Sequence, residues 1–116
     1  MNRFEAEVRA RGLTVYAHID HAAGATAVGL SLRPTELLVF GNAKAGTPLM
    51  QAAQTLGIDL PLKALVWQDE SGIARLSYND PGFVARRHGL NGANDTEVGA
   101  IAATLNAIAR KATTPS

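Results

Sequence analysis

An apolar run that leads into a glycine-bracketed loop is the feature that most constrains this fold. Leu37 to Phe40 is apolar at every position, Gly41 and Gly46 flank the loop, and Thr47-Pro48 follows. Such a run is typical of a central strand covered on both sides, although periodicity alone leaves a short buried helix open. Thr47 is a good N-cap and Pro48 suits the first helical position. The sequence therefore predicts a strand, a tight loop and a helix N-terminus in succession.

The segments before this corner predict a helix, a strand and a second helix. Phe4 and Val8 lie one helical turn apart, and Gly12 follows as glycine often follows a helix end. Leu13 to Asp20 then alternates apolar and polar residues, the period of two that describes a half-buried strand. Asp20 is expected to cap a short helix that runs to about Leu30.

The segments after the corner predict two helices and a hairpin between them. The first helix carries its apolar residues on one face and stops at Gly57; these residues are Leu49, Ala52, Ala53 and Leu56. Residues 62–68 and 73–78 flank Asp69-Glu70-Ser71-Gly72, which predicts a hairpin. Asp80-Pro81 caps a helix through Arg87.

The C-terminal part predicts one longer helix. Residues 91–94 read as a polar linker, and Asp95 is expected to cap a helix with a single apolar stripe of Val98, Ile101, Leu105 and Ile108. Together the elements predict an α/β (α+β) fold in one small domain. Its sheet has about four strands, one antiparallel hairpin among them, with helices packed on it. The predicted division is residues 1–90 as the core, 91–94 as the linker and 95–112 as a helix packed on the same domain.

Composition excludes several classes of function. The chain has 116 residues, 47% of them hydrophobic, which suffices for one domain with its own core. It has no cysteine, so disulfides and thiolate chemistry are excluded, and its net charge of +1 gives no basic footprint for nucleic acid or membrane lipid. The N-terminus shows no signal-peptide pattern and no stretch is apolar enough to span a bilayer, so we expect a soluble, cytoplasmic protein.

The glycine-bracketed loop is the candidate ligand site. Free backbone N–H groups collect where a strand, a loop and a helix N-terminus meet, and such a corner binds phosphate, sulfate or carboxylate. A P-loop would place a lysine directly before the hydroxyl residue, whereas Lys44 lies inside the loop, which argues against a nucleoside triphosphatase. The alternative is a tight turn with a helix cap and a solvated lysine. The predicted ligand-binding residues are Asn42, Lys44, Gly46, Thr47 and Lys63.

The histidines suggest a metal site less strongly. His18 and His21 flank Asp20, but on either local geometry the two histidines point apart, so we predict structural roles and no metal. His88 precedes Gly89 and is expected to serve a helix C-terminus.

An enzymatic alternative rests on polar groups expected at strand ends, where acid–base chemistry can be assembled. These groups are Asp20, Lys63, Tyr78 and Asp80. One sequence does not show whether they converge, and a flat, dry surface there would instead favour a structural or interaction protein.

Several of these segments, taken together, resemble a known family. The matching segments run in order from about Gly12 to Leu90 and are Gly12–Val15, Ile19–Ala23, Leu37–Asn42, Gly46–Met50, Asp59–Lys63 and Ser77–Pro81. They resemble the bacterial and archaeal family called domain of unknown function 302. The resemblance implies a compact α/β domain, often dimeric, and supplies no established activity, cofactor or catalytic residue. It places the final helix outside the shared core.

The leading functional hypothesis is a homodimeric binding module for a small anion at the corner. An alanine-rich second face of the final helix, with Ala102, Ala103, Ala107 and Ala112, favours contact with another copy of the chain.

Overall fold

The fold is an antiparallel sheet with helices on one face and at both ends. The computed structural model describes residues 1–90, 92 and 94–113. In that part of the chain the elements are α1 (Asn2–Ala10), β1 (Thr14–Asp20), α2 (His21–Ala27), β2 (Thr35–Gly41), α3 (Ala43–Ala52), the 3-10 helix η1 (Gln54–Ile58), β3 (Leu62–Gln68), β4 (Ala74–Tyr78), α4 (Pro81–Arg87) and α5 (Asp95–Thr113). The predicted fold class is confirmed. The predicted linker includes residues 91 and 93, which lie outside the described residues.

The sheet is a meander in which each strand pairs with its sequence neighbour. Its order is β1-β2-β3-β4 and every pairing is antiparallel. The predicted hairpin joins β3 to β4: Oδ1 of Asp69 accepts the backbone N–H of Ser71 and of Ile73, and Gly72 adopts a φ of 81°. A left-handed φ favours glycine, so the glycine at position 72 accounts for the turn that the sequence predicted.

A bulge in β1 changes which side chains reach the core. The register shifts between Val15 and Ala17, so Val15 packs against the buried cluster under the helices, while Ala17 and Ile19 face the other side. The prediction of strict alternation through this strand was therefore wrong on one point.

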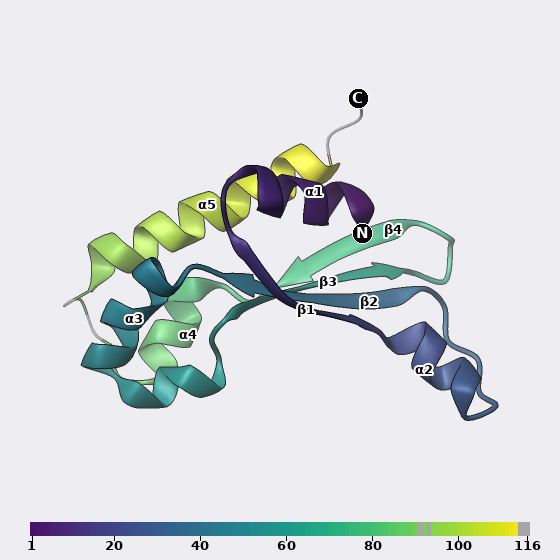
Figure 1. The fold of residues 1–116 in the computed structure, drawn as a ribbon, viewed down its shortest axis with the longest axis horizontal. Helices are drawn as coiled ribbons and strands as arrows, with labels where there is room; N and C mark the ends of the chain where they lie inside the picture. The colour runs from purple at the N-terminus through teal and green to yellow at the C-terminus, as the bar shows by residue number, and fades with distance from the viewer. Residues whose placement is uncertain (91, 93, 114–116) are drawn as a thin grey trace.

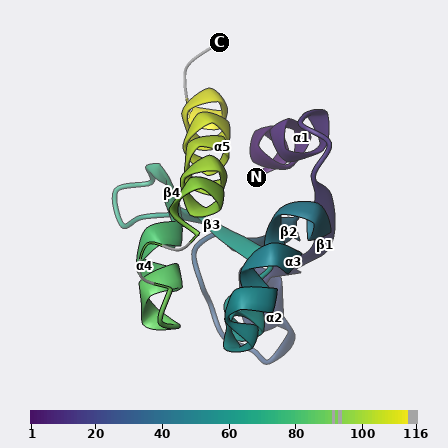
Figure 2. The same cartoon turned by 90° about the vertical axis from the view of Figure 1, so that its left-hand side faces the viewer.

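Two helices cover one face of the sheet. Figures 1 and 2 show α1 and α5 side by side on that face, with α3 and α4 near one end of the strands and α2 at the other. Beneath α1 and α5 lies the main core, whose buried members are Phe4, Val8, Leu38, Phe40, Ala64, Leu105 and Ile108. The rings of Phe4 and Phe40 pack edge to face, with their centroids 5.5 Å apart.

A second buried cluster lies among the helices at the end of the sheet. It consists of Leu49, Leu56, Val84, Ala85 and Leu90. The stripe predicted on the final helix joins the two clusters: Val98 and Ile101 pack on the second, whereas Leu105 and Ile108 belong to the first. Helix α5 therefore ties the sheet to the α3–α4 end.

The opposite face of the sheet is only partly covered. The register places Ile19, Leu37 and Leu65 in one row across β1, β2 and β3 on this face, and Ile19 is 42% exposed. Leu37 and Leu65 are half-buried, so the prediction that β2 is covered on both sides was wrong. We call this surface the open face; its apolar and aromatic members are Ala17, Ile19, Leu37, Val39, Leu65 and Trp67.

Two of the four predicted helix caps are correct. Asp95, predicted as the cap of the final helix, is instead the first residue of α5. Asp20 accepts the N–H of Ala23 at the start of α2, and Asp80 accepts the N–H of Gly82 at the start of α4. Helix α3, however, begins at Ala43 with Asn42 as its N-cap, and Thr47-Pro48 lies inside it. Asparagine is an even better cap than threonine, so the helix starts at Ala43 and not at Pro48 as predicted.

The predicted end of this helix was also wrong. Helix α3 stops at Ala52, and residues 54–58 continue as η1, which contains Gly57. Pro48 lies inside this helix and has no N–H, so the carbonyl of Lys44 in the preceding turn does not receive its usual helical hydrogen bond.

Candidate functional site

The corner at Asn42–Thr47 is the first turn of α3. The Oδ1 of Asn42 accepts the N–H of Lys44 at 2.9 Å, and the carbonyl of Asn42 accepts the N–H of Ala45 and Gly46. Three backbone donors that were expected to hold an anion are therefore already used. Any charge recognition at this corner falls to the Lys44 side chain.

A pocket of about 510 Å³ lies beside this turn. Its walls come from the start of β1, from α3, from the segment before β3 and from α5, and they are mostly apolar. The residues that line it include Leu13, Tyr16, Lys44, Leu60, Glu97 and Ile101. Four of the predicted site residues, Asn42, Lys44, Gly46 and Thr47, line the same pocket.

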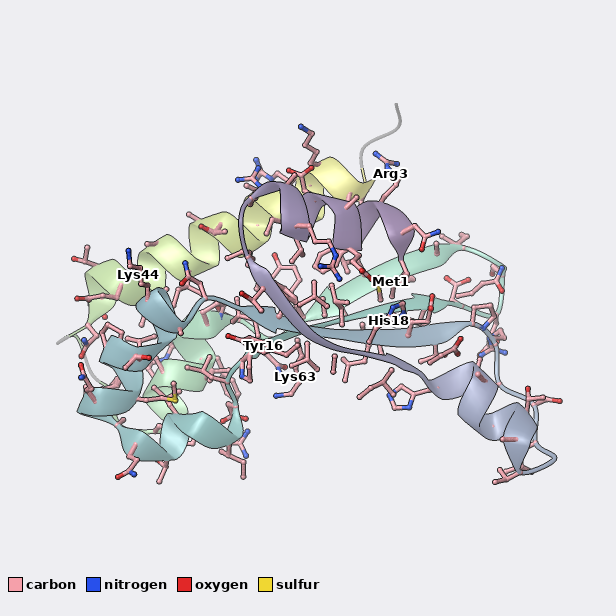
Figure 3. All side chains as sticks on the ribbon, in the orientation of Figure 1. Met1, Arg3, Tyr16, His18, Lys44 and Lys63 are labelled. Carbon is pink, nitrogen blue, oxygen red and sulfur yellow. The ribbon has the colours of Figure 1, made fainter. Side chains whose placement is uncertain are left out.

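Two opposite charges stand on facing walls of the pocket. Lys44 comes from α3 and Glu97 from α5, and Figure 3 shows Lys44 reaching toward the beginning of α5. Within the described residues, neither side chain forms an ion pair with a protein group. A ligand group can therefore pair with either charge.

Lys63 lies elsewhere. It is on β3, opposite Val39 in the register, and so points to the open face, as Figure 3 shows. Lys63 is not among the residues that line the pocket. The structure thus separates the fifth predicted ligand residue from the other four.

The four residues of the enzymatic alternative are not brought together. Asp20 ends β1 at one edge of the sheet, where it caps α2, while Tyr78 ends β4 at the other edge. Tyr78 shares a face with Ala64, next to Lys63 in β3, so Tyr78 and Lys63 point to opposite sides. Asp80 is used as the cap of α4.

His18 and His21 are separated, in line with the prediction that they point apart. His18 lies between two glutamates on the covered face, with Nε2 at 2.9 Å from Glu36 and Nδ1 at 3.3 Å from Glu5, so it joins α1 to the sheet. His21 is exposed at the first position of α2. No group of three or more potential ligands is placed to hold a metal ion in the described part of the chain. Whether the protein binds metal stays a prediction.

His88 belongs to a polar cluster that sequence reasoning missed. It does lie at the C-terminus of α4, as expected, but its ring nitrogens contact Thr55 and Asp59. The hydrogen bond from His88 lowers the pKa of Asp59 most, and the nearby charges of Arg87 and Lys63 lower it further. These partners are 29 and 33 residues from His88 in sequence, so no local signal could have found them.

The chain is similar to three curated proteins from Brucella. It is 45% identical over 101 residues to the "Fluoride-specific ion channel FluC 1" of Brucella suis biovar 1. The matched region covers 87% of this chain and 40% of that protein. A protein of the same description from Brucella abortus gives 45% identity over 37% of its length. The chain thus spans about two fifths of the relatives it matches. Within the described residues, none of the helices is both long enough and apolar enough to cross a bilayer.

A solved structure and a family model agree on the fold. The structure of an uncharacterized conserved DUF302 protein from Bacillus stearothermophilus superposes with a TM-score of 0.84 at 19% identity, over 96% of this chain and 86% of that one. The family model "Domain of unknown function DUF302" matches residues 1–111. The match includes α5, which the resemblance had placed outside the shared core. This chain belongs to the DUF302 family.

Proposed function

We propose that this chain is a binding domain for a small anionic molecule, held in the pocket beside α3 by Lys44. The observation that carries the proposal is a lysine that has no ion-pair partner among the described residues and lies at the edge of an apolar pocket of about 510 Å³. Small-molecule sites have this character: mostly apolar walls of several hundred Å³ with a few polar groups that orient the ligand.

The composition of the walls narrows the class of ligand. The apolar lining, with Leu13, Leu60 and Ile101, favours a ligand that carries an apolar body as well as a charge. Glu97 on the facing wall repels a second negative charge. A monoanion such as a short-chain carboxylate therefore fits better than inorganic phosphate.

Titration calorimetry with hexanoate, acetate, sulfate and phosphate tests this proposal. We expect hexanoate to bind best, and Lys44→Ala to weaken it about 10-fold, the usual worth of one charge-assisted hydrogen bond. Lys63→Ala is the matched control, because Lys63 lies outside the pocket, and it should leave the affinity unchanged. Absence of binding by every anion would refute the proposal, and so would an equal loss in the two lysine variants.

We further propose that the domain works as a homodimer. The open face supports this better than the alanines of α5, because Ala112 already packs on the main core. Ile19 on the open face is 42% exposed, and soluble proteins commonly cover such a face with a second copy around a two-fold axis. We keep the cytoplasm as the proposed location. The net charge of +1 supports the proposal that neither a nucleic acid nor a membrane surface is a partner.

A second candidate function comes from the Brucella relatives. They are described as fluoride-specific ion channels and are matched over about two fifths of their length, so we propose that domains of this kind can serve a channel as an accessory, anion-sensing part. Fluorine NMR of sodium fluoride tests this candidate. Protein-dependent broadening that Lys44→Ala abolishes would support it, and an unchanged fluoride signal at millimolar protein would refute it.

A further inference from the structure

Thr55, His88 and Asp59 form a continuous hydrogen-bonded chain outside the pocket. The Oγ1 of Thr55 lies 2.9 Å from Nδ1 of His88, and Nε2 of His88 lies 2.5 Å from Oδ2 of Asp59. The side chain of His88 is 10% exposed and that of Asp59 18%, whereas Thr55 at the other end is exposed. The histidine is therefore shielded while the hydroxyl stays accessible to a substrate.

The protonation pattern of this chain follows from its donors and acceptors. An ionised carboxylate only accepts hydrogen bonds, so Nε2 of His88 must carry the proton that it donates to Asp59. In the neutral ring Nδ1 then holds a lone pair, and the hydroxyl of Thr55 donates to it. Asp59 stays ionised, because the hydrogen bond from His88 and the Arg87 guanidinium, 3.7 Å away, keep the pKa of its carboxyl below the usual range.

A hydroxyl bonded to a general base that a carboxylate orients is the arrangement that activates a nucleophile. We propose that these three residues form a site for hydrolysis of small carboxylic esters, with Thr55 as the nucleophile. Each element fixes one member: η1 carries Thr55, Asp59 follows it directly, and His88 ends α4.

The reaction proceeds in two balanced steps. Oγ1 of Thr55 bonds to the ester carbonyl carbon while its proton passes to Nδ1 of His88, and the bond to the alkoxy oxygen breaks as that oxygen takes the proton. Water then attacks the acyl-threonine, its proton passing through Nδ1 of His88 to Oγ1 of Thr55 as the carboxylic acid leaves. Asp59 is a positioning residue, which holds the ring in the required tautomer and stabilises its cationic form.

Hydrolysis of p-nitrophenyl acetate by the full chain tests the proposal. We expect p-nitrophenolate release to fall about 100-fold in Thr55→Val and in His88→Gln, and to survive in Thr55→Ser, which keeps the hydroxyl. Mass spectrometry after an acid quench should place one acetyl group on Thr55.

Two controls separate the reaction from surface acetylation and from unfolding. Thr26→Val removes another exposed threonine, in α2, and should leave the rate unchanged. Circular dichroism shows whether His88→Gln still folds, and Thr55→Val, a near-isosteric change, decides the question if it does not. A rate in Thr55→Val equal to that of the unsubstituted chain, or acetyl groups on lysines alone, would overturn the proposal.

Discussion

The two faces of one sheet are used differently in this protein. On β2, Leu38 is fully buried under α1 and α5, whereas its neighbour Leu37 is half-buried on the open face. The same residue type on the same strand therefore contributes to the core on one side and to a partly exposed surface on the other. An antiparallel sheet can be stabilised by packing one face on the core while the other face is exposed to solvent. The second face is then available for contacts with other molecules.

The largest expected effect comes from exchanging these two neighbours separately. Leu38→Ala should lower the free energy of unfolding by about 2–5 kcal/mol, the usual range for a fully buried leucine. Leu37→Ala should lower the free energy of unfolding by less than half as much as Leu38→Ala, because it removes less buried apolar surface. Urea denaturation of both variants measures the difference. Equal losses would mean that the open face is as buried in solution as the covered face.

A charge on the open face should change the assembly and not the fold. Ile19→Lys should convert a two-chain species into a single chain in light scattering at about 100 μM protein, because a lysine is costly to bury in an apolar interface. Val28→Lys, at an exposed position just after α2, is the matched control and should leave the mass unchanged. A strictly monomeric unsubstituted chain, or a dimer that survives Ile19→Lys, would exclude the open face as the interface.

The cap of α3 gives the next effect in size, at the end of the sheet that carries the pocket. Asn42→Ala should cost about 1 kcal/mol of stability, because it removes the acceptor for the N–H of Lys44. Thr47→Val should cost much less, since Thr47 is exposed within the helix. Thermal unfolding distinguishes the two positions. A larger loss of stability in Thr47→Val than in Asn42→Ala would mean that Thr47 caps the helix, as the sequence predicted.

That cap shows where sequence reasoning succeeds and where it stops. Asp20, Asp80 and the Asp69–Gly72 turn were predicted correctly, because each signal acts within a few residues. At the corner two valid caps, Asn42 and Thr47, compete one turn apart, and local physics alone does not rank them.

The candidate sites show the limit more clearly. Four residues of the pocket were predicted because they follow one another in sequence, whereas the α5 wall with Glu97 was not. Asp59 and His88 meet only because the helices at the α3–α4 end pack together, and such long-range contacts leave no periodic pattern. Which face of β2 is covered likewise depends on where α1 and α5 pack.

The smallest effect concerns acid sensitivity at the same end of the molecule. The pKa of Asp59 is lowered in the folded chain by its hydrogen bond with His88, so this carboxylate stabilises the fold above its unfolded pKa, near 3.8. That contribution is lost as the pH falls through the lower, folded-state pKa. Asp59→Asn should therefore flatten the fall in urea midpoint below about pH 4. Asp69, whose pKa is also lowered, contributes to the slope in both proteins. An unchanged profile in Asp59→Asn would contradict the assignment to Asp59.

Chemical-shift mapping tests most directly whether the pocket and the open face have separate roles. Hexanoate is added to the ¹⁵N-labelled chain and the amide shifts are followed. We expect the shift changes to concentrate at Asn42–Thr47 and along the pocket wall of α5, at positions 97–104. The amides of Ile19, Leu37 and Leu65 on the open face should stay unchanged. Shifts centred on the open face, or none anywhere at saturating hexanoate, would contradict it.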